Sequence, residues 1–212
     1  MAQASVNSLR LYAVAAVESG QLASLAEGTF LVHYRALAAI VEVSPYTAAP
    51  LDDEEMAKYL HVLEDAYVHA TVLPAPPGTV FQSHSILMRW LELHYFTLTE
   101  ALATVEGHAA ARVSITHAAN QENGDAGRSF AALAAESLRL LRGQAAATVT
   151  LPKVDGDEED GVVARASFLV DSQRWQMFQD MVSKEAKRQS ALKFEVTGPW
   201  PPYDFVRMQF GG

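Results

Sequence analysis

The sequence predicts an α+β protein of two domains, and three observations support this prediction. Apolar residues alternate with polar ones in short segments such as Leu9–Ala13, which is typical of strands. Two longer segments of the first half repeat apolar residues every three or four positions, the period of an amphipathic helix. After Gly107 the pattern reads strand, helix, strand, strand, helix, strand, the ferredoxin-like βαββαβ order. The predicted domains are residues 1–107 and 108–212, and one domain with a long linker helix is the competing interpretation.

The first domain is predicted to begin with extended segments and to continue with two helices. Residues Thr29–Val43 form the second extended region. Asp52 or Asp53 begins a helix, because acidic and N-capping side chains are favoured in the first turn. Its apolar stripe is predicted from spacings of three and four residues and comprises Met56, Leu60, Leu63, Tyr67 and Ala70. Ser83 begins a longer helix, and Gly107 stands where a C-cap glycine is expected.

The second domain is predicted to end in a proline-rich aromatic tail. Strands are expected at Arg112–Thr116, Thr148–Leu151, Val162–Val170 and Leu192–Thr197, with Asp171 capping the second helix. In the tail, which begins at Gly198, three prolines restrict the backbone towards polyproline II, so little entropy is lost on docking. Trp200, Tyr203 and Phe205 supply aromatic area. The tail is predicted to pack on its own domain, and part of it to contact a partner, since Trp and Tyr are enriched at interface hot spots.

Composition excludes several classes of function. The 212 residues are 50% hydrophobic, include no cysteine and carry a formal net charge of −9. Disulfides and cysteine-ligated zinc are therefore excluded. Binding to nucleic acid or to an anionic membrane surface is disfavoured, because both depend on clustered Lys and Arg. No apolar run approaches the roughly 20 residues that cross a bilayer, so we expect a cytoplasmic protein.

No segment predicts an active site. The acidic loop Asp155–Asp160 lacks the glycine and glutamate spacing of a calcium-binding EF-hand, so a solvated hairpin loop is the favoured interpretation. His61, Asp65 and His69 lie along one side of a helix, as zinc ligands at i, i+4 do, but no further ligand is identifiable. We therefore predict no catalytic, cofactor-binding or metal-binding residues and no enzymatic activity.

The tail resembles the C-terminal signature of the gas vesicle GvpF/GvpL family, which looks like L-T-G-P-W-P-P-Y-S/N-F-V. Here it is Val196–Val206, with Asp204 at the variable position. Weaker similarities cover most of the chain and occur at Leu11–Val14, Leu37–Ser44, Val72–Pro74, Gly78–Phe81 and Ala166–Asp171. One departure is Ala75-Pro76-Pro77, where many members have Leu-Arg-Phe. The departure removes an arginine and an aromatic residue, so a partner contact that they make in other members is not expected here.

The resemblance implies an accessory protein of gas vesicle formation. It implies binding to the small hydrophobic shell protein and to other accessory proteins, a location in the cytoplasm or on the gas vesicle, and no catalytic residues. It also implies two α+β domains, the second of them ferredoxin-like. Trp200, Tyr203 and Phe205 are the predicted partner-binding residues. The alternatives are a minor structural component of the vesicle shell, or a small-molecule-binding or enzymatic ferredoxin-like protein.

Overall fold

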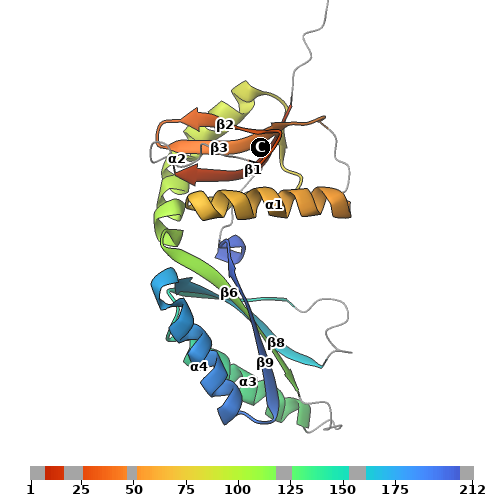
Figure 1. Cartoon of the computed structure of the whole chain (residues 1–212), viewed down its shortest axis with the longest axis vertical. Coiled ribbons are helices and arrows are strands. Elements are labelled where there is room, and N and C mark those ends of the chain that lie inside the picture. Colours follow the sequence, from red (N-terminus) through yellow and green to blue (C-terminus); the bar gives the residue numbers. More distant parts are fainter. Residues whose placement is uncertain (1–7, 17–25, 47–51, 118–125, 153–160, 206–212) are drawn as a thin grey trace, which may run out of the picture. The chain divides into compact units, whose positions relative to one another are not determined.

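The computed structural model describes residues 8–16, 26–46, 52–117, 126–152 and 161–205. Contacts between these residues divide the chain into two compact units, which meet in the sequence between Glu106 and Gly107. Each unit holds one antiparallel sheet with two long helices (Figure 1). This arrangement confirms the predicted mixture of helix and antiparallel sheet. None of the described helices combines the length and the apolar character that crossing a membrane requires.

Unit 1 is built on a sheet with the strand order β2-β3-β1-β4, in which β5 also pairs with β1. The strands are β1 (Leu9–Ala16), β2 (Thr29–Tyr34), β3 (Leu37–Val43), β4 (Val72–Pro74) and β5 (Val80–Phe81). The predicted extended region is thus a hairpin, in which Tyr34 lies opposite Leu37. The tight turn between them places Arg35 at a φ of 52°, in the left-handed region.

Two helices pack on this sheet, α1 (Asp53–His69) and α2 (His84–Val105). Both begin at the predicted caps: Asp52 accepts the backbone N–H of Glu55 at 2.8 Å, and Ser83 accepts that of Ile86 at 3.3 Å. The buried leucines of α2 share one core with alternate residues of β3, namely Leu37, Ala39 and Val41. Glu42, the next residue of β3, instead bonds Lys58 of α1. The two helices therefore cover opposite faces of the sheet.

The predicted apolar stripe of α1 is only partly confirmed, because Leu63 is fully buried while Met56, Tyr67 and Ala70 are half-buried. The buried residues of this helix are Tyr59, Val62, Leu63 and Ala66, whereas the Leu60 side chain is 41% exposed. The helix carries two overlapping apolar stripes, so its period alone does not decide between them. The sheet decides, because the Tyr59 ring stacks on Tyr12 and its hydroxyl donates to the Ala75 carbonyl at 2.5 Å.

Unit 2 comprises Gly107–Phe205 and follows the predicted βαββαβ order of elements. The elements are β6 (His108–His117), α3 (Ala126–Arg142), β7 (Ala147–Thr150), β8 (Val162–Asp171), η1 (Ser172–Arg174), α4 (Trp175–Arg188), β9 (Leu192–Trp200) and η2 (Tyr203–Phe205). All pairs of its sheet are antiparallel, in the order β7-β8-β6-β9. The Asp171 side chain accepts the N–H of Gln173 and so caps the 3-10 turn η1. The helix that Asp171 was expected to cap, α4, begins directly after this turn.

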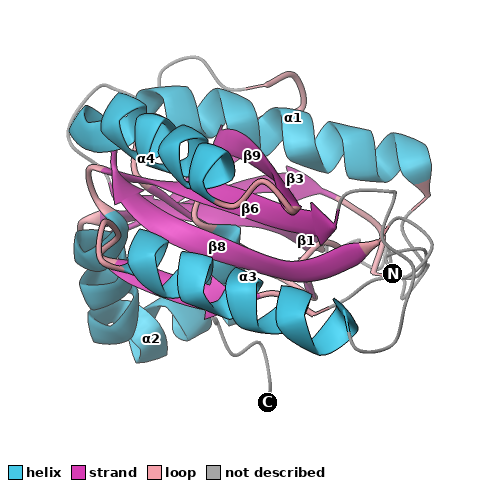
Figure 2. Cartoon of the chain, turned by 90° about the horizontal axis from the view of Figure 1, so that it is seen from below, coloured by secondary structure: helices cyan, strands magenta, loops and turns pink. Residues whose placement is uncertain are grey.

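The core of unit 2 lies between α3, α4 and one face of its sheet (Figure 2). Alternate residues of β8, namely Ala166, Phe168 and Val170, face the two helices, as the alternation of the sequence predicts. Phe178 of α4 packs its ring 5.3 Å from that of Phe168. The opposite face of this sheet has no long helix of its own unit among the described elements, and residues 201–205 lie there.

Candidate functional site

The predicted tail begins inside the last strand. β9 continues through Gly198 and Pro199 to Trp200, which pairs with Ala110 of β6, and the register shifts between this pair and the pair formed by Arg112 and Thr197. The expectation of polyproline geometry is therefore wrong for these three residues. β6 offers an edge with which the backbone can pair, and an irregular register accommodates a proline, which has no N–H to donate.

Gly198 is the residue that permits this path. Its φ is +126°, a backbone angle that residues other than glycine rarely adopt. A Cβ built at this position would lie 2.6 Å from the carbonyl oxygen of Ala110 and 2.8 Å from the Trp175 ring. Only glycine lets β9 approach both groups, which gives a physical reason for the glycine in the Thr-Gly-Pro-Trp segment.

Beyond β9 the tail crosses the sheet of unit 2. Pro201 and Pro202 are buried, and the Asp204 carboxylate accepts two hydrogen bonds from the Arg112 guanidinium, both 2.9 Å long. The turn η2 then contacts β7, which is the edge strand opposite to β9. Arg112 alternates along β6 with core residues that face α3 and α4. Residues 201–205 therefore lie over the other face, where Ser167 and Leu169 are also buried.

The three predicted partner residues are half-buried: Trp200 ends β9, and Tyr203 and Phe205 lie on the crossing segment. The Trp200 indole N–H donates to the Thr197 hydroxyl at 3.1 Å, so its polar atom is satisfied and the rest of its ring is available for apolar contact. Backbone bonds hold η2: the Tyr203 N–H donates to the Pro201 carbonyl at 2.7 Å, and the Phe205 N–H to that of Pro202 at 3.1 Å. The aromatic residues thus project from a backbone that is already ordered.

Sequence reasoning missed the ion pair that anchors the tail. Asp204 stands at the variable position of the tail signature, and Arg112 lies 92 residues earlier in the chain. No spacing rule connects residues so far apart. The pairing of β6 with β9 brings Arg112 and Asp204 together, because it places the last strand of unit 2 beside the first.

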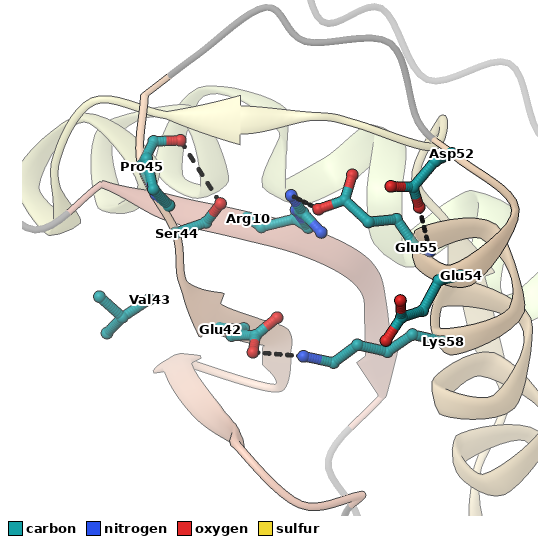
Figure 3. A pocket seen from close by; sticks show the side chains of 9 residues that line it. All are labelled: Arg10, Glu42, Val43, Ser44, Pro45, Asp52, Glu54, Glu55 and Lys58. Atoms are coloured by element: carbon teal, nitrogen blue, oxygen red, sulfur yellow. Dashed lines mark hydrogen bonds and ion pairs between the residues drawn. The ribbon is translucent and has the colours of Figure 1, made fainter.

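A second candidate, also missed, is a polar cavity of about 290 Å³ in unit 1 (Figure 3). It is lined by residues of β1, of β3 with the segment that follows it, and of the start of α1: Arg10, Glu42, Val43, Ser44, Pro45, Asp52, Glu54, Glu55 and Lys58. Because these residues come from three separate segments, no sequence motif indicates the cavity. No histidine is among them.

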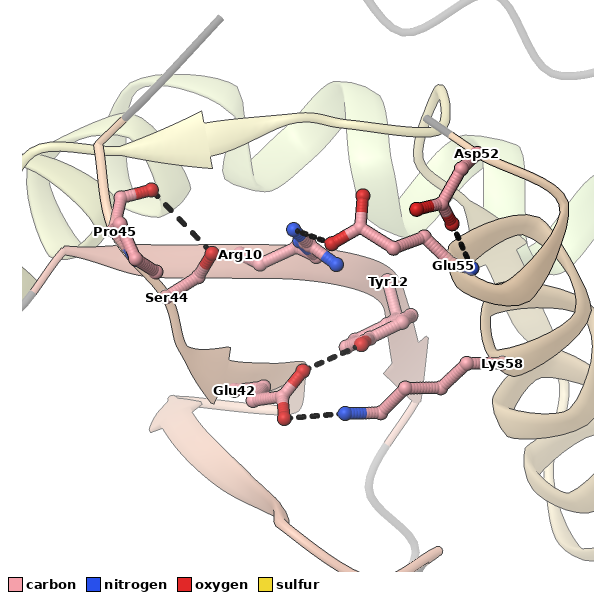
Figure 4. A network of polar contacts seen from close by, with 8 residues as sticks. All are labelled: Arg10, Tyr12, Glu42, Ser44, Pro45, Asp52, Glu55 and Lys58. Atoms are coloured by element: carbon pink, nitrogen blue, oxygen red, sulfur yellow. Dashed lines mark hydrogen bonds and ion pairs between the residues drawn. The ribbon is translucent and has the colours of Figure 1, made fainter. Parts of the chain in front are cut away.

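The charged groups of the cavity are largely paired with one another (Figure 4). Arg10 binds Glu55 at 2.8 Å, while Glu42 accepts hydrogen bonds from Lys58 at 2.5 Å and from the Tyr12 hydroxyl at 2.7 Å. Burial by itself raises the pKa of Glu42, but these two bonds outweigh it and the pKa lies below its ordinary value. Burial and the bond to Glu42 raise the pKa of Tyr12. Both groups thus keep their neutral-pH protonation states, and the network attaches α1 to the sheet.

The histidines of α1 are not brought together with further metal ligands among the described residues. His61 and His69 are exposed on α1, and the described part of the chain contains no group of three or more His, Asp or Glu side chains placed to hold a metal ion. The acidic loop Asp155–Asp160 lies outside the described residues.

The departure at Ala75-Pro76-Pro77 lies in the turn between β4 and β5. Ala75 is buried, and its N–H donates to the Tyr12 carbonyl at 2.8 Å. Pro76 and Pro77 are exposed, and the Pro76 carbonyl accepts the N–H of Thr79. The departure therefore changes a surface turn and leaves the sheet contact at Ala75 in place.

Comparisons with known proteins agree on one family. The model of the gas vesicle synthesis protein GvpL/GvpF family matches residues 9–145 and 122–207. Gas vesicle protein F1 of Halobacterium salinarum is 25% identical over 190 residues, which cover 88% of this chain and 84% of that protein. Gas vesicle protein F of Haloferax mediterranei is 26% identical over 191 residues, or 88% of this chain and 85% of that protein.

Solved structures show the same fold. The crystal structure of gas vesicle protein GvpF from Anabaena superposes with a TM-score of 0.76 at 13% identity, covering 96% of this chain and 99% of that one. That of GvpF from Microcystis aeruginosa gives 0.71 at 13% identity, covering 95% and 100%. Since the family model spans nearly the whole described chain, this protein belongs to the GvpL/GvpF family of gas vesicle proteins.

Proposed function

We propose that this protein is a non-catalytic accessory protein of gas vesicle assembly that binds the hydrophobic shell protein through its tail. The observation that carries the proposal is the anchored aromatic segment of unit 2. Trp200, Tyr203 and Phe205 are partly accessible, while Gly198, the buried prolines and the ion pair of Asp204 with Arg112 fix the backbone beneath them.

Such a surface suits an apolar partner. An aromatic side chain buries a large area, and a backbone that is ordered beforehand loses little further entropy on binding. A shell protein whose assembled form excludes water exposes apolar surface before assembly, and such surface aggregates unless it is shielded. A rigid aromatic segment provides complementary area for shielding it. The other accessory proteins of the vesicle are further proposed partners.

Two finer assignments belong to the same proposal. The element order of unit 2 and its strand order β7-β8-β6-β9 support a ferredoxin-like class for this unit. The proposed absence of catalysis is consistent with the cavity of unit 1, in which both bases, Arg10 and Lys58, are paired with glutamates of the lining.

Co-purification with the shell protein tests the proposal. Wild-type protein is expected to retain the shell protein at low and high salt, and the variants Trp200→Ala and Phe205→Ala to retain several-fold less. Tyr46→Ala is the matched control, because Tyr46 is an aromatic residue of unit 1 that is 59% exposed. Absence of a wild-type complex at every salt concentration would refute shell binding, whereas full binding by folded tail variants would move the contact elsewhere.

The assembly role has a separate test in cells. Deleting the gene is expected to abolish buoyant, light-scattering cells, and re-expression of the wild-type chain is expected to restore them. An assembly factor should be lost when intact vesicles are washed, whereas a minor shell component should stay with them. Normal vesicles in the deletion strain would contradict the assembly role.

A further inference from the structure

We propose that two copies of this chain associate by pairing their β2 strands antiparallel, with Leu31 of one copy opposite Leu31 of the other. β2 pairs with β3 on one side, and no described strand pairs with its other side. An edge of this kind presents unpaired backbone N–H and C=O groups, to which a further strand can add. The pairing would join two sheets into one across a twofold axis.

The β2 edge lacks the features that protect the other edges. The six residues from Thr29 to Tyr34 include no proline, lysine, arginine or carboxylate. The opposite edge of the same sheet is made by strands of only three and two residues, one of which ends at Pro74. In unit 2, β9 presents Lys193 and Glu195, both exposed, and β7 has four residues. Short strands, charges and prolines are the usual protections of an edge, so β2 is the edge suited to pairing.

Charges at the two ends of β2 identify a second copy as the occupant. Glu27 precedes the strand and Arg35 follows it, and both are exposed. The Arg35 guanidinium lies 5.3 Å from the centre of the Tyr34 ring and 5.1 Å from that of Tyr95, which holds the cation at this end. Glu27 and Arg35 lie in the turns that flank β2, each four residues from Leu31, so an antiparallel pair centred there brings each Glu27 to the same end of the pairing as Arg35 of the second copy.

The side chains of the edge fit the same register. Phe30 and Val32 flank Leu31, so Phe30 of each copy lies opposite Val32 of the other. Val32 is only 4% exposed and belongs to the core of unit 1, so Phe30 supplies most of the new contact area of this cross-strand pair. Phe30 is 39% exposed in the single chain. The apolar surface continues onto α2, where the Tyr95 ring contacts that of Tyr34 and the neighbouring Phe96 is 77% exposed.

Single-cysteine variants test both the dimer and its register, since the chain has no cysteine of its own. Opposite residues of an antiparallel pair have Cα atoms about 4.5–5.5 Å apart, within the range that a disulfide bridges. Leu31→Cys is expected to form a disulfide-linked dimer in most chains under mild oxidation. Thr29→Cys and His33→Cys are the matched controls: each alone should remain largely unlinked, whereas a mixture of the two should cross-link.

Charge exchange tests the choice of partner. Arg35→Glu brings like charges together at each end of the pairing and is expected to weaken dimerisation roughly tenfold in sedimentation equilibrium. Adding Glu27→Arg restores opposite charges and should recover most of the loss. Arg142→Glu, the same charge change on α3 of unit 2, should leave dimerisation unchanged.

These measurements use the purified chain without the shell protein, so their outcome is independent of the proposed function. A wild-type chain that sediments as a monomer up to about 100 µM, together with no cross-link at Leu31→Cys, would overturn the proposal. A monomer whose binding to the shell protein is abolished by Leu31→Lys would also overturn it, and would assign the edge to a strand of the shell protein.

Discussion

The two sheets of this protein are covered in different ways. In unit 1 both faces carry a helix, α1 on one and α2 on the other. In unit 2 both helices pack on one face, and residues 201–205 lie across the other. A helix satisfies its own backbone hydrogen bonds, whereas a short tail needs specific anchors. Unit 2 should therefore be the more sensitive of the two to single substitutions near the end of the chain.

The largest expected effect comes from Gly198→Ala. The new methyl group would meet the Ala110 carbonyl and the Trp175 ring, and the backbone is held at a φ that alanine rarely adopts. Overpacking and backbone strain together should lower the free energy of unfolding of unit 2 by about 3 kcal/mol. Chemical denaturation followed by Trp fluorescence would measure the loss.

Gly107→Ala is the control for that substitution. Gly107 also has a positive φ, of 69°, but a Cβ there would meet nothing within 4 Å. Gly107→Ala should lower the free energy of unfolding only through the unfavourable backbone angle, by about 1 kcal/mol. Equal losses at the two positions would show that the close approach of β9 to β6 is not what Gly198 provides.

A smaller effect is expected where α3 meets α4. Glu185 is buried and accepts hydrogen bonds from Ser137 at 2.6 Å and from Arg188 at 2.8 and 2.7 Å. Glu185→Ala leaves the fully buried Ser137 hydroxyl without this acceptor, so we expect a loss of about 2 kcal/mol in thermal or chemical unfolding. Glu136→Ala removes the more exposed partner of the same arginine and should cost less than about 0.5 kcal/mol.

The anchor of the tail should contribute less, because its arginine is 45% exposed. Arg112→Ala removes a bidentate pair with Asp204 and should destabilise unit 2 by about 1 kcal/mol. The exchange Arg112→Asp with Asp204→Arg should recover part of this. If the single variant weakens shell-protein binding without altering stability, the ion pair orients the aromatic residues more than it holds the fold together.

The smallest effect near neutral pH is expected from two carboxylates whose protonation lowers the stability of the protein in acid. The bonds from Arg188 lower the pKa of Glu185, and those from Lys58 and Tyr12 lower the pKa of Glu42 despite burial. A carboxylate whose pKa is lower in the folded protein than its ordinary value of 4.5 stabilises the fold at pH values above 4.5. This stabilisation is lost as the pH falls through the pKa that the carboxylate has in the folded protein. Unfolding measured between pH 6 and 3 should therefore depend less on pH in Glu42→Gln, and an unchanged slope would contradict this.

The helix starts were read correctly from the sequence, whereas most errors lie where two elements meet. Asp52 and Ser83 begin their helices as predicted, because a capping side chain bonds a backbone only three residues away. The buried stripe of α1 was only partly predicted, since its position depends on Tyr12 and Ala75 of the sheet. The cavity network and the pair of Arg112 with Asp204 were missed for the same reason.

The sequence by itself determined the βαββαβ order of elements in unit 2, the starts of both helices in unit 1 and the family to which the tail signature points. These features depend on hydrogen bonds and periodicities that span a few neighbouring residues. Only the tertiary structure decided which stripe of α1 is buried, how β9 extends through Gly198 to Trp200, and which face of the sheet the tail covers. Each depends on contacts between residues far apart in the chain, and chain spacing carries no information about such contacts until the strands have paired.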